Sequence, residues 1–170
     1  MYIGAFCMKT IEIYGEIFST QYTYIREACR GIVISNGKIL LSYESNFDQY
    51  IIPGGGFENN ETLEECCTRE LAEETGYVVK PHKHYLTINE HYGEWLFTSH
   101  YYVCEQIGKT EMKLTDTELE TGLEFQWLPL EEAIEIFSKY QSSAKENQQK
   151  RGMYLREYKA LSCFVEEQNG

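Results

Sequence analysis

A helix with recognisable signals at both ends, directly preceded by three glycines, constrains this chain more than any other feature. Residues 53–77 read PGGGFENNETLEECCTRELAEETGY. Thr62 and Glu65 have the spacing of a capping box, in which each side chain bonds to the other residue's backbone N–H at the start of a helix. Gly76 suits the left-handed residue that ends one. The sequence therefore predicts a helix over residues 62–75, entered from a flexible, glycine-rich loop.

The apolar stripe of this helix turns acidic halfway along. It begins at Leu63, and steps of three and four residues lead from there to Glu70, Glu73 and Glu74. Like charges at these spacings destabilise a helix, and anions near its C-terminus are unfavourable. Two interpretations are open: a solvated acidic face, or carboxylates that hold Mg²⁺ or Mn²⁺, which prefer oxygen ligands. The glycines favour the second, because they let the backbone approach a ligand closely.

Length and composition indicate one globular domain. The chain has 170 residues, of which 42% are hydrophobic and 25% charged, and this argues against disorder. We expect a single domain over residues 1–170, with an N-terminal extension or strand over 1–20 and a C-terminal helix over 141–170. The sequence has neither an apolar run of about 18–20 residues nor a secretory signal at its N-terminus. A cytoplasmic protein without a membrane partner is therefore expected.

Charge and cysteine content narrow the classes of partner. The 27 acidic and 15 basic residues give a formal charge of −12, which disfavours nucleic acid as a partner in the absence of a local basic patch. The cysteines form no CxxC pair and no Cys/His group with zinc-ligand spacing. We expect all six to be reduced thiols, mostly in the core: Cys7, Cys29, Cys66, Cys67, Cys104 and Cys163.

Strand and helix patterns alternate along the rest of the chain. Asn36-Gly37 predicts a hairpin turn, and residues 107–122 are polar and predict a loop. The interleaving of the two patterns, with hairpins, predicts an α/β fold with a mixed sheet covered by helices. Strands are expected at residues 9–18, 27–34, 38–43, 50–52, 77–90, 94–106 and 123–128, and further helices at 130–140 and 148–168.

Seven residues of the glycine loop and the helix form a longer pattern that resembles the signature of the Nudix hydrolase family, which includes MutT-like proteins. The pattern's last position is usually aliphatic, and here it is Tyr77. The resemblance extends over about residues 20–140 and implies the Nudix fold, an α/β/α sandwich around a mixed β-sheet. The matching residues are Gly55, Glu61, Arg69, Glu70, Glu73, Glu74 and Gly76.

The resemblance also implies an activity and a metal. Nudix hydrolases cleave a P–O–P bond in a nucleoside diphosphate linked to another group, with a divalent cation. The implied ligands of Mg²⁺, or of Mn²⁺, are Glu70, Glu73, Glu74 and the carbonyl of Gly55. Glu70 or an acid further along the chain would orient or deprotonate the attacking water.

Other motif residues receive structural or substrate-binding roles from the same resemblance. Arg69 and Glu61 would form an ion pair that holds the loop to the helix, and Gly76 would end the helix. The glycines of the loop would lie against the substrate: Gly54, Gly55 and Gly56.

A further carboxylate in this family often comes from the loop before the last strand. Of the acids there, we favour Glu120, and after it Glu118, because they precede Trp127 by seven to nine residues. The alternative is that these acids are only solvated. The full set of candidates is Asp116, Glu118, Glu120 and Glu124.

Basic and aromatic residues supply candidates for substrate contact. Arg30, on a strand that leads towards the loop together with Arg26, is a candidate phosphate contact, with a surface ion pair as the alternative. The basic C-terminal helix reads as a packing helix with a solvated side, with a homodimer contact or a wall of the substrate pocket as alternatives. Rings expected near the pocket are Tyr43, Tyr50, Phe57, Tyr92 and Trp95.

By elimination, the expected activity is that of a nucleoside triphosphate pyrophosphatase. The motifs of the NADH and coenzyme A branches of the family are absent, and Pro81 lies too early for the ADP-ribose branch. The alternatives are an ADP-ribose or dinucleoside polyphosphate hydrolase, a non-catalytic nucleotide-sensing module, and an enzyme that processes RNA ends. Every carboxylate of the motif is present, which favours catalysis over sensing.

Overall fold

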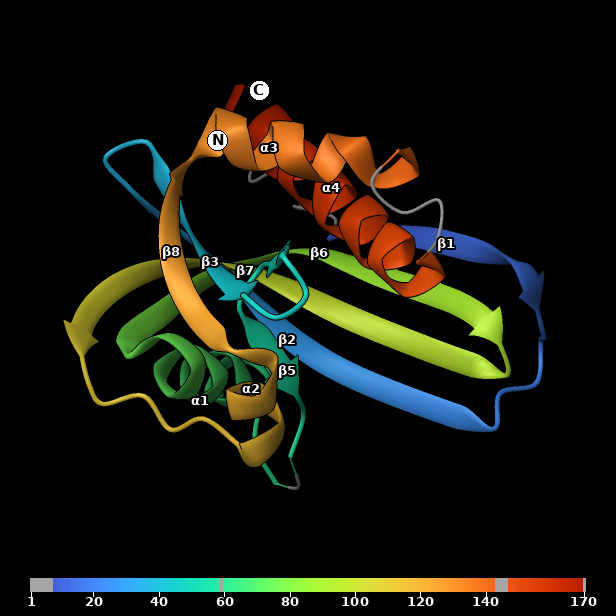
Figure 1. Cartoon of the computed structure of the whole chain (residues 1–170), viewed down its shortest axis with the longest axis horizontal. Coiled ribbons are helices and arrows are strands. Elements are labelled where there is room, and N and C mark those ends of the chain that lie inside the picture. The colour runs from blue at the N-terminus through green and yellow to red at the C-terminus, as the bar shows by residue number, and fades with distance from the viewer. Residues whose placement is uncertain (1–7, 59, 143–146, 170) are drawn as a thin grey trace, which may run out of the picture.

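The structure is a computed structural model that describes residues 8–58, 60–142 and 147–169. Five strands precede the first helix, and the remaining strands are interspersed with helices (Figure 1). The strands are β1 (Lys9–Phe18), β2 (Tyr24–Ser35), β3 (Lys38–Glu44), β4 (Gln49–Ile51), β5 (Gly54–Gly56), β6 (Tyr77–Gly93), β7 (Trp95–Lys109) and β8 (Leu123–Pro129). The helices are α1 (Leu63–Thr75), α2 (Asp116–Thr121), α3 (Leu130–Ser138) and α4 (Gln148–Asn169), with a 3₁₀ turn at Lys139–Gln141.

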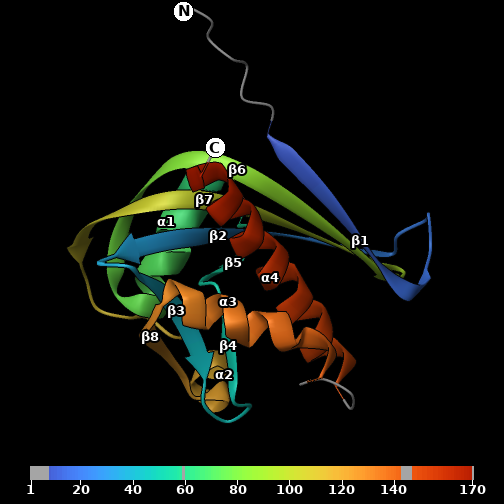
Figure 2. The same cartoon turned by 90° about the horizontal axis from the view of Figure 1, so that it is seen from above.

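The strands form one mixed sheet with helices on both faces. Its main path runs β1-β6-β7-β2-β3-β4, while β5 pairs with β2 and β8 pairs with β3. β1 with β6 and β2 with β7 are parallel pairs, and the others are antiparallel. Helix α1 covers one face, and α3 and α4 lie over the other, as Figures 1 and 2 show. The predicted α/β/α sandwich around a mixed sheet is confirmed.

Helix α1 begins and ends at the residues that its sequence indicates. The Thr62 side chain accepts from the Glu65 N–H at 3.2 Å, and the Thr62 N–H donates to the Glu65 carboxylate at 2.7 Å. Gly76 ends the helix with φ of 70°. Three residues of α1 are fully buried against β2: Cys66, Cys67 and Leu71. This packing determines which side of the helix faces away from the core.

Two predicted loops are ordered elements instead. The glycine run is strand β5, because its backbone pairs with residues 28–30 of β2. Residues 107–122 continue β7 to Lys109 and then contain α2, which Thr115 and Glu118 start with their own capping box. Both predictions were wrong because they relied on composition. The glycine content gave no sign of the backbone pairing with β2, and the polarity of residues 107–122 gave no sign of the capping box.

The second face of the sheet is closed by α4. Buried on this helix are Tyr154, Ala160, Leu161, Cys163 and Phe164, which join the larger of the two core clusters. Arg156, which the sequence places on a solvated basic side, is only 8% exposed. It is buried because carboxylates on α4 and β6 bind its guanidinium, so burial here follows ionic pairing and not hydrophobicity.

The cysteines outside the N-terminal segment are free and buried, as predicted. They are Cys29, Cys66, Cys67, Cys104 and Cys163. Cys7 and the rest of residues 1–7 lie outside the described residues. Among the helices that are described, none has the length and apolar character needed to cross a membrane.

A half-buried histidine on β6 predicts how stability depends on pH. Desolvation and the neighbouring His100 lower the pKa of His84 below its ordinary value of 6.5, while Tyr102 stacks on its ring and Glu64 opposes the shift. The folded protein therefore resists a proton that the unfolded chain binds. This contribution to stability is complete above pH 6.5 and is lost as the pH falls through the lowered pKa.

We expect the free energy of unfolding to fall as the pH drops from about 7.5 to about 5.5. His84→Gln, which does not titrate, is expected to flatten part of this slope in urea denaturation series. An equal slope in the two proteins would contradict the assignment.

Candidate active site

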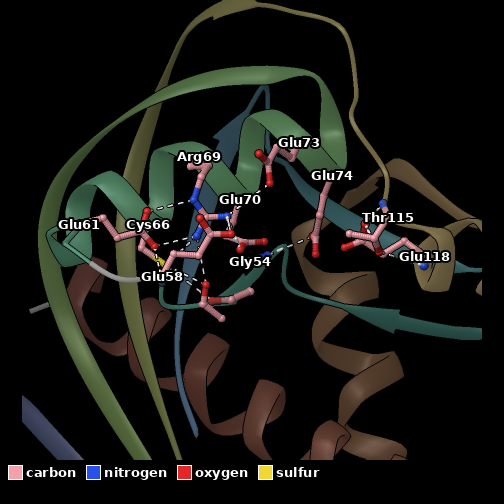
Figure 3. Close-up of polar contacts among 12 residues, drawn as sticks. Gly54, Glu58, Glu61, Cys66, Arg69, Glu70, Glu73, Glu74, Thr115 and Glu118 are labelled. Carbon is pink, nitrogen blue, oxygen red and sulfur yellow. Dashed lines mark hydrogen bonds and ion pairs between the residues drawn. The ribbon is translucent and has the colours of Figure 1, made fainter.

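Arg69 is the centre of an ionic network that joins α1 to the chain before it. Its Nε and Nη2 donate to the two oxygens of Glu61 at 2.9 and 2.7 Å, and Nη2 also donates to the Gly56 carbonyl at 3.1 Å. Nη1 binds Glu70 at 2.7 Å and Glu73 at 3.3 Å (Figure 3). The Arg69 hydrogen bonds lower the pKa of Glu61 to about 2. The residues expected to tie loop to helix therefore do so with bidentate geometry.

Glu70 lies directly against the glycine strand. A Cβ placed on Gly55 would stand 2.2 Å from an oxygen of the Glu70 carboxylate, so any larger residue there would force this carboxylate to move. Desolvation raises the pKa of Glu70, although Arg69 opposes the shift. The carbonyl of Gly55, an expected metal ligand, has the Cys66 thiol 3.7 Å away.

Glu74 is the most buried acid of the helix. Its Oε2 accepts from the Ser42 hydroxyl and from the Gly54 N–H, both at 3.1 Å, and the residue is 9% exposed. Burial raises its pKa to about 8, despite these hydrogen bonds and the nearby charge of Arg30. Glu73 is more open, with 38% of its side chain exposed.

The two downstream acids that we favoured lie in different surroundings. Glu118 lines the same cavity as Glu74 and contributes to the raised pKa of Glu70, while one of its oxygens caps α2. The exposed Glu120 is absent from the cavity lining, and its carbonyl accepts from Asn46 at 2.7 Å. Sequence distance from Trp127 could not separate them, because a short helix turns their side chains in different directions.

A cavity of about 290 Å³ connects the acidic end of α1 with the sheet. Its walls come from nine of the strands and helices already described, among them β2, β7 and α4. At one end lie Gly54, Glu74 and Glu118, and from there the lining continues past Arg30 to Phe97 and Arg156.

Arg30 is a buried cation that has no ion pair among the described residues. It is 8% exposed, its Nη1 donates to the Ile52 carbonyl at 2.9 Å, and its Nε has no hydrogen-bond partner within that part of the chain. Arg26 lies four residues before it on the same face of β2 and also lines the cavity. A buried charge without a counterion is costly, so Arg30 favours an anion in the cavity.

The donor set at the end of α1 fits a hard divalent cation. Glu70, Glu73, Glu74 and the Gly55 carbonyl offer only oxygen, which Mg²⁺ and Mn²⁺ prefer. The carboxylates are now bound by Arg69, Ser42 and backbone, and the described residues hold no preformed cluster of three metal-binding side chains. A cation would therefore replace some of these hydrogen bonds.

The family model of the NUDIX domain matches residues 26–152. The chain belongs to the Nudix family. As a Nudix pyrophosphohydrolase, it is an enzyme, and α1 with the glycine strand is its signature segment. A search of curated proteins gave no match.

Solved structures agree on the Nudix fold. A NUDIX hydrolase from Nitrosomonas europaea has a TM-score of 0.55 at 18% identity, over 79% of this chain and 88% of that one. A MutT protein from Methanosarcina mazei has 0.54 at 18% identity, over 81% and 95%. A UDP-X diphosphatase has 0.51 at 18% identity, over 66% of this chain and 54% of that one. At these identities, the likeness shows the fold alone.

Several residues of the site were not predicted from the sequence. Phe97, which lines the cavity, was not among the rings expected near the pocket, and Ser42, which donates to Glu74, was not predicted either. Strand alternation cannot tell which face of a sheet is covered, so no pattern in the sequence singles out either residue. Arg156 was noted only as part of a basic stretch.

Proposed function

We propose that this protein is a Mg²⁺-dependent Nudix hydrolase that cleaves the P–O–P bond of a nucleoside diphosphate derivative, with a nucleoside triphosphate as the favoured substrate. Mn²⁺ is the alternative metal. ADP-ribose and dinucleoside polyphosphates are the alternative substrates, and a non-catalytic nucleotide sensor is the alternative function. The reaction would take place at the acidic end of the cavity.

The observation that carries this proposal is that acidic and basic side chains line the same cavity. Glu74 and Glu118 line one end, and the buried Arg30 lines the same cavity without an ion pair among the described residues. A polyphosphate needs cations on both sides: a metal between it and the carboxylates, and a guanidinium for its outer oxygens. The acids and the arginine that line the cavity support both contacts.

Each side chain would have a distinct task. Glu70, Glu73, Glu74 and the Gly55 carbonyl would hold the cation, which supplies Lewis-acid activation of water and neutralises phosphate charge. Arg30 would bind and orient a phosphate. The glycines have no side chain, so the phosphate could approach their backbone closely. Glu70, or Glu118 as the downstream acid that reaches the cavity, would accept the proton of the attacking water.

The decisive test is Glu74→Gln. Both hydrogen bonds of Glu74 end on a single oxygen, so the glutamine amide can accept them and keep the fold, but it offers no charge to a metal. We expect hydrolysis of nucleoside triphosphates in Mg²⁺ to fall at least about 100-fold with little loss of stability. Products would be identified by mass spectrometry and the fold checked by thermal denaturation.

Glu64→Gln is the matched control, because it removes a charge from the exposed start of the same helix. It is expected to retain activity. The panel would include ADP-ribose and dinucleoside polyphosphates. Equal activity of the Glu74→Gln protein would overturn the metal assignment, and tight nucleotide binding without turnover would favour the sensor.

A further inference from the structure

Beyond the acidic end of α1, the cavity reaches a part of the sheet that the proposed chemistry does not use. Phe97 and Ser99 lie two residues apart on the same face of β7, and both line the cavity. Ala28 of β2 pairs with Ser99 and lines it as well. Because two small, buried side chains lie beside a large ring, the sheet surface is hollowed into a slot next to Phe97.

The Phe97 ring is supported by two further aromatic side chains. Trp95 stacks on it with a centroid separation of 5.3 Å and an interplanar angle of 4°, and Tyr24 stacks on Trp95 at 4.4 Å. Trp95, Phe97 and Ser99 follow one another along one face of β7, so Trp95 occupies one face of the Phe97 ring and the other lies towards Ser99. A supported ring with an open face is a stacking surface for a planar group.

Arg156 lines this cavity from α4, on the side opposite to the sheet. Its Nη1 donates to Glu90 at 3.2 Å and its Nη2 to Glu157 at 2.6 Å, and Tyr101 donates to Glu157 at 3.0 Å. These partners are buried, so the guanidinium is held in one orientation. A guanidinium has five N–H donors, and the Nε of Arg156 has no hydrogen-bond partner among the described residues. Donors therefore remain for a ligand.

We propose that this slot binds the heterocyclic base of the substrate, with Phe97 stacking on the ring and Arg156 donating to a ring carbonyl. The inference rests on the proposed function, which places the phosphates of the same molecule beside Arg30. A carbonyl opposite Arg156 accepts a hydrogen bond, whereas an amino group at that ring position sets donor against donor. The slot therefore prefers hypoxanthine to adenine and uracil to cytosine.

The test measures binding separately from cleavage. Calorimetry would follow the monophosphates of inosine, adenosine, uridine and cytidine, and kcat/KM would be measured for the four triphosphates in Mg²⁺. We expect the carbonyl member of each pair to bind at least about fivefold more tightly. Phe97→Ala is expected to weaken all four about tenfold, and Arg156→Gln, whose amide can either donate or accept, to bring the ratio within each pair close to one.

Ile25→Ala is the matched control, because it truncates an exposed apolar side chain on the opposite face of the same sheet region and is expected to change neither measurement. Equal binding within both pairs together with an inert Phe97→Ala would overturn the slot. The wild-type ratios need no variant, so they decide the carbonyl preference even if Arg156→Gln does not fold. A base preference without cleavage would support the slot and contradict the proposed reaction. Cleavage without a base preference would support the reaction and contradict the slot.

Discussion

Gly54→Ala is expected to destabilise the folded protein by about 4 kcal/mol, which is a large share of the stability of an ordinary domain. Gly54 has φ of 145°, a region that only glycine adopts readily. An added Cβ would stand 2.0 Å from the Cys29 carbonyl oxygen and 2.7 Å from the Cα of Arg30. These contacts are backbone, so β5 would have to separate from β2. Urea denaturation would measure the change.

Gly56→Ala is the matched control two residues further along the same short strand. The nearest atom to its added Cβ is 3.8 Å away, at the end of the Arg26 side chain, and its φ lies outside the left-handed region. Here we expect no loss, or a gain of up to about 1 kcal/mol from the stiffer unfolded chain. Similar stability of the two variants would mean that β5 is not held against β2 as described.

Arg69→Met is expected to destabilise the protein by about 3 kcal/mol. The change leaves Glu61, Glu70 and Glu73 without their shared cation, and removal of one partner from a largely buried ion pair is costly because the other charges stay desolvated. The Arg69 side chain is 22% exposed, so solvent screens the loss only in part. Chemical denaturation without added metal would measure it.

Two further measurements separate charge from geometry at this position. Arg69→Lys keeps the charge and loses the bidentate fork, so we expect a smaller destabilisation, about half as large. Lys9→Ala breaks an exposed ion pair with Glu166 and is expected to cost at most about 0.5 kcal/mol. Added Mg²⁺ should recover part of the Arg69→Met loss, because it neutralises the same carboxylates. An Arg69→Met loss no larger than that of Lys9→Ala would show that the network contributes little.

The start and end of α1 could be predicted because both signals are local. The capping box of Thr62 and Glu65 and the left-handed Gly76 act within one turn of the chain. The same holds for the acidic face, since helix geometry alone places Glu70, Glu73 and Glu74 near one another.

The glycine strand and the choice between the downstream acids could not be predicted in this way. Residues 54–56 form β5 only because β2, more than twenty residues earlier, offers free backbone groups. Glu118 rather than Glu120 reaches the cavity because α2 sets the directions of both side chains.

The Nudix signature segment, the α/β class and the candidate metal-binding acids can be predicted from the sequence, because these depend on contacts between residues close in the chain or on a spacing pattern. What faces those acids depends on tertiary packing. Arg30, Phe97 and Arg156 come from three separate elements, and they meet in one cavity because the register of β2 with β7 and the packing of α4 bring them together. Such contacts depend on where whole elements pack, and no local pattern in the chain encodes that.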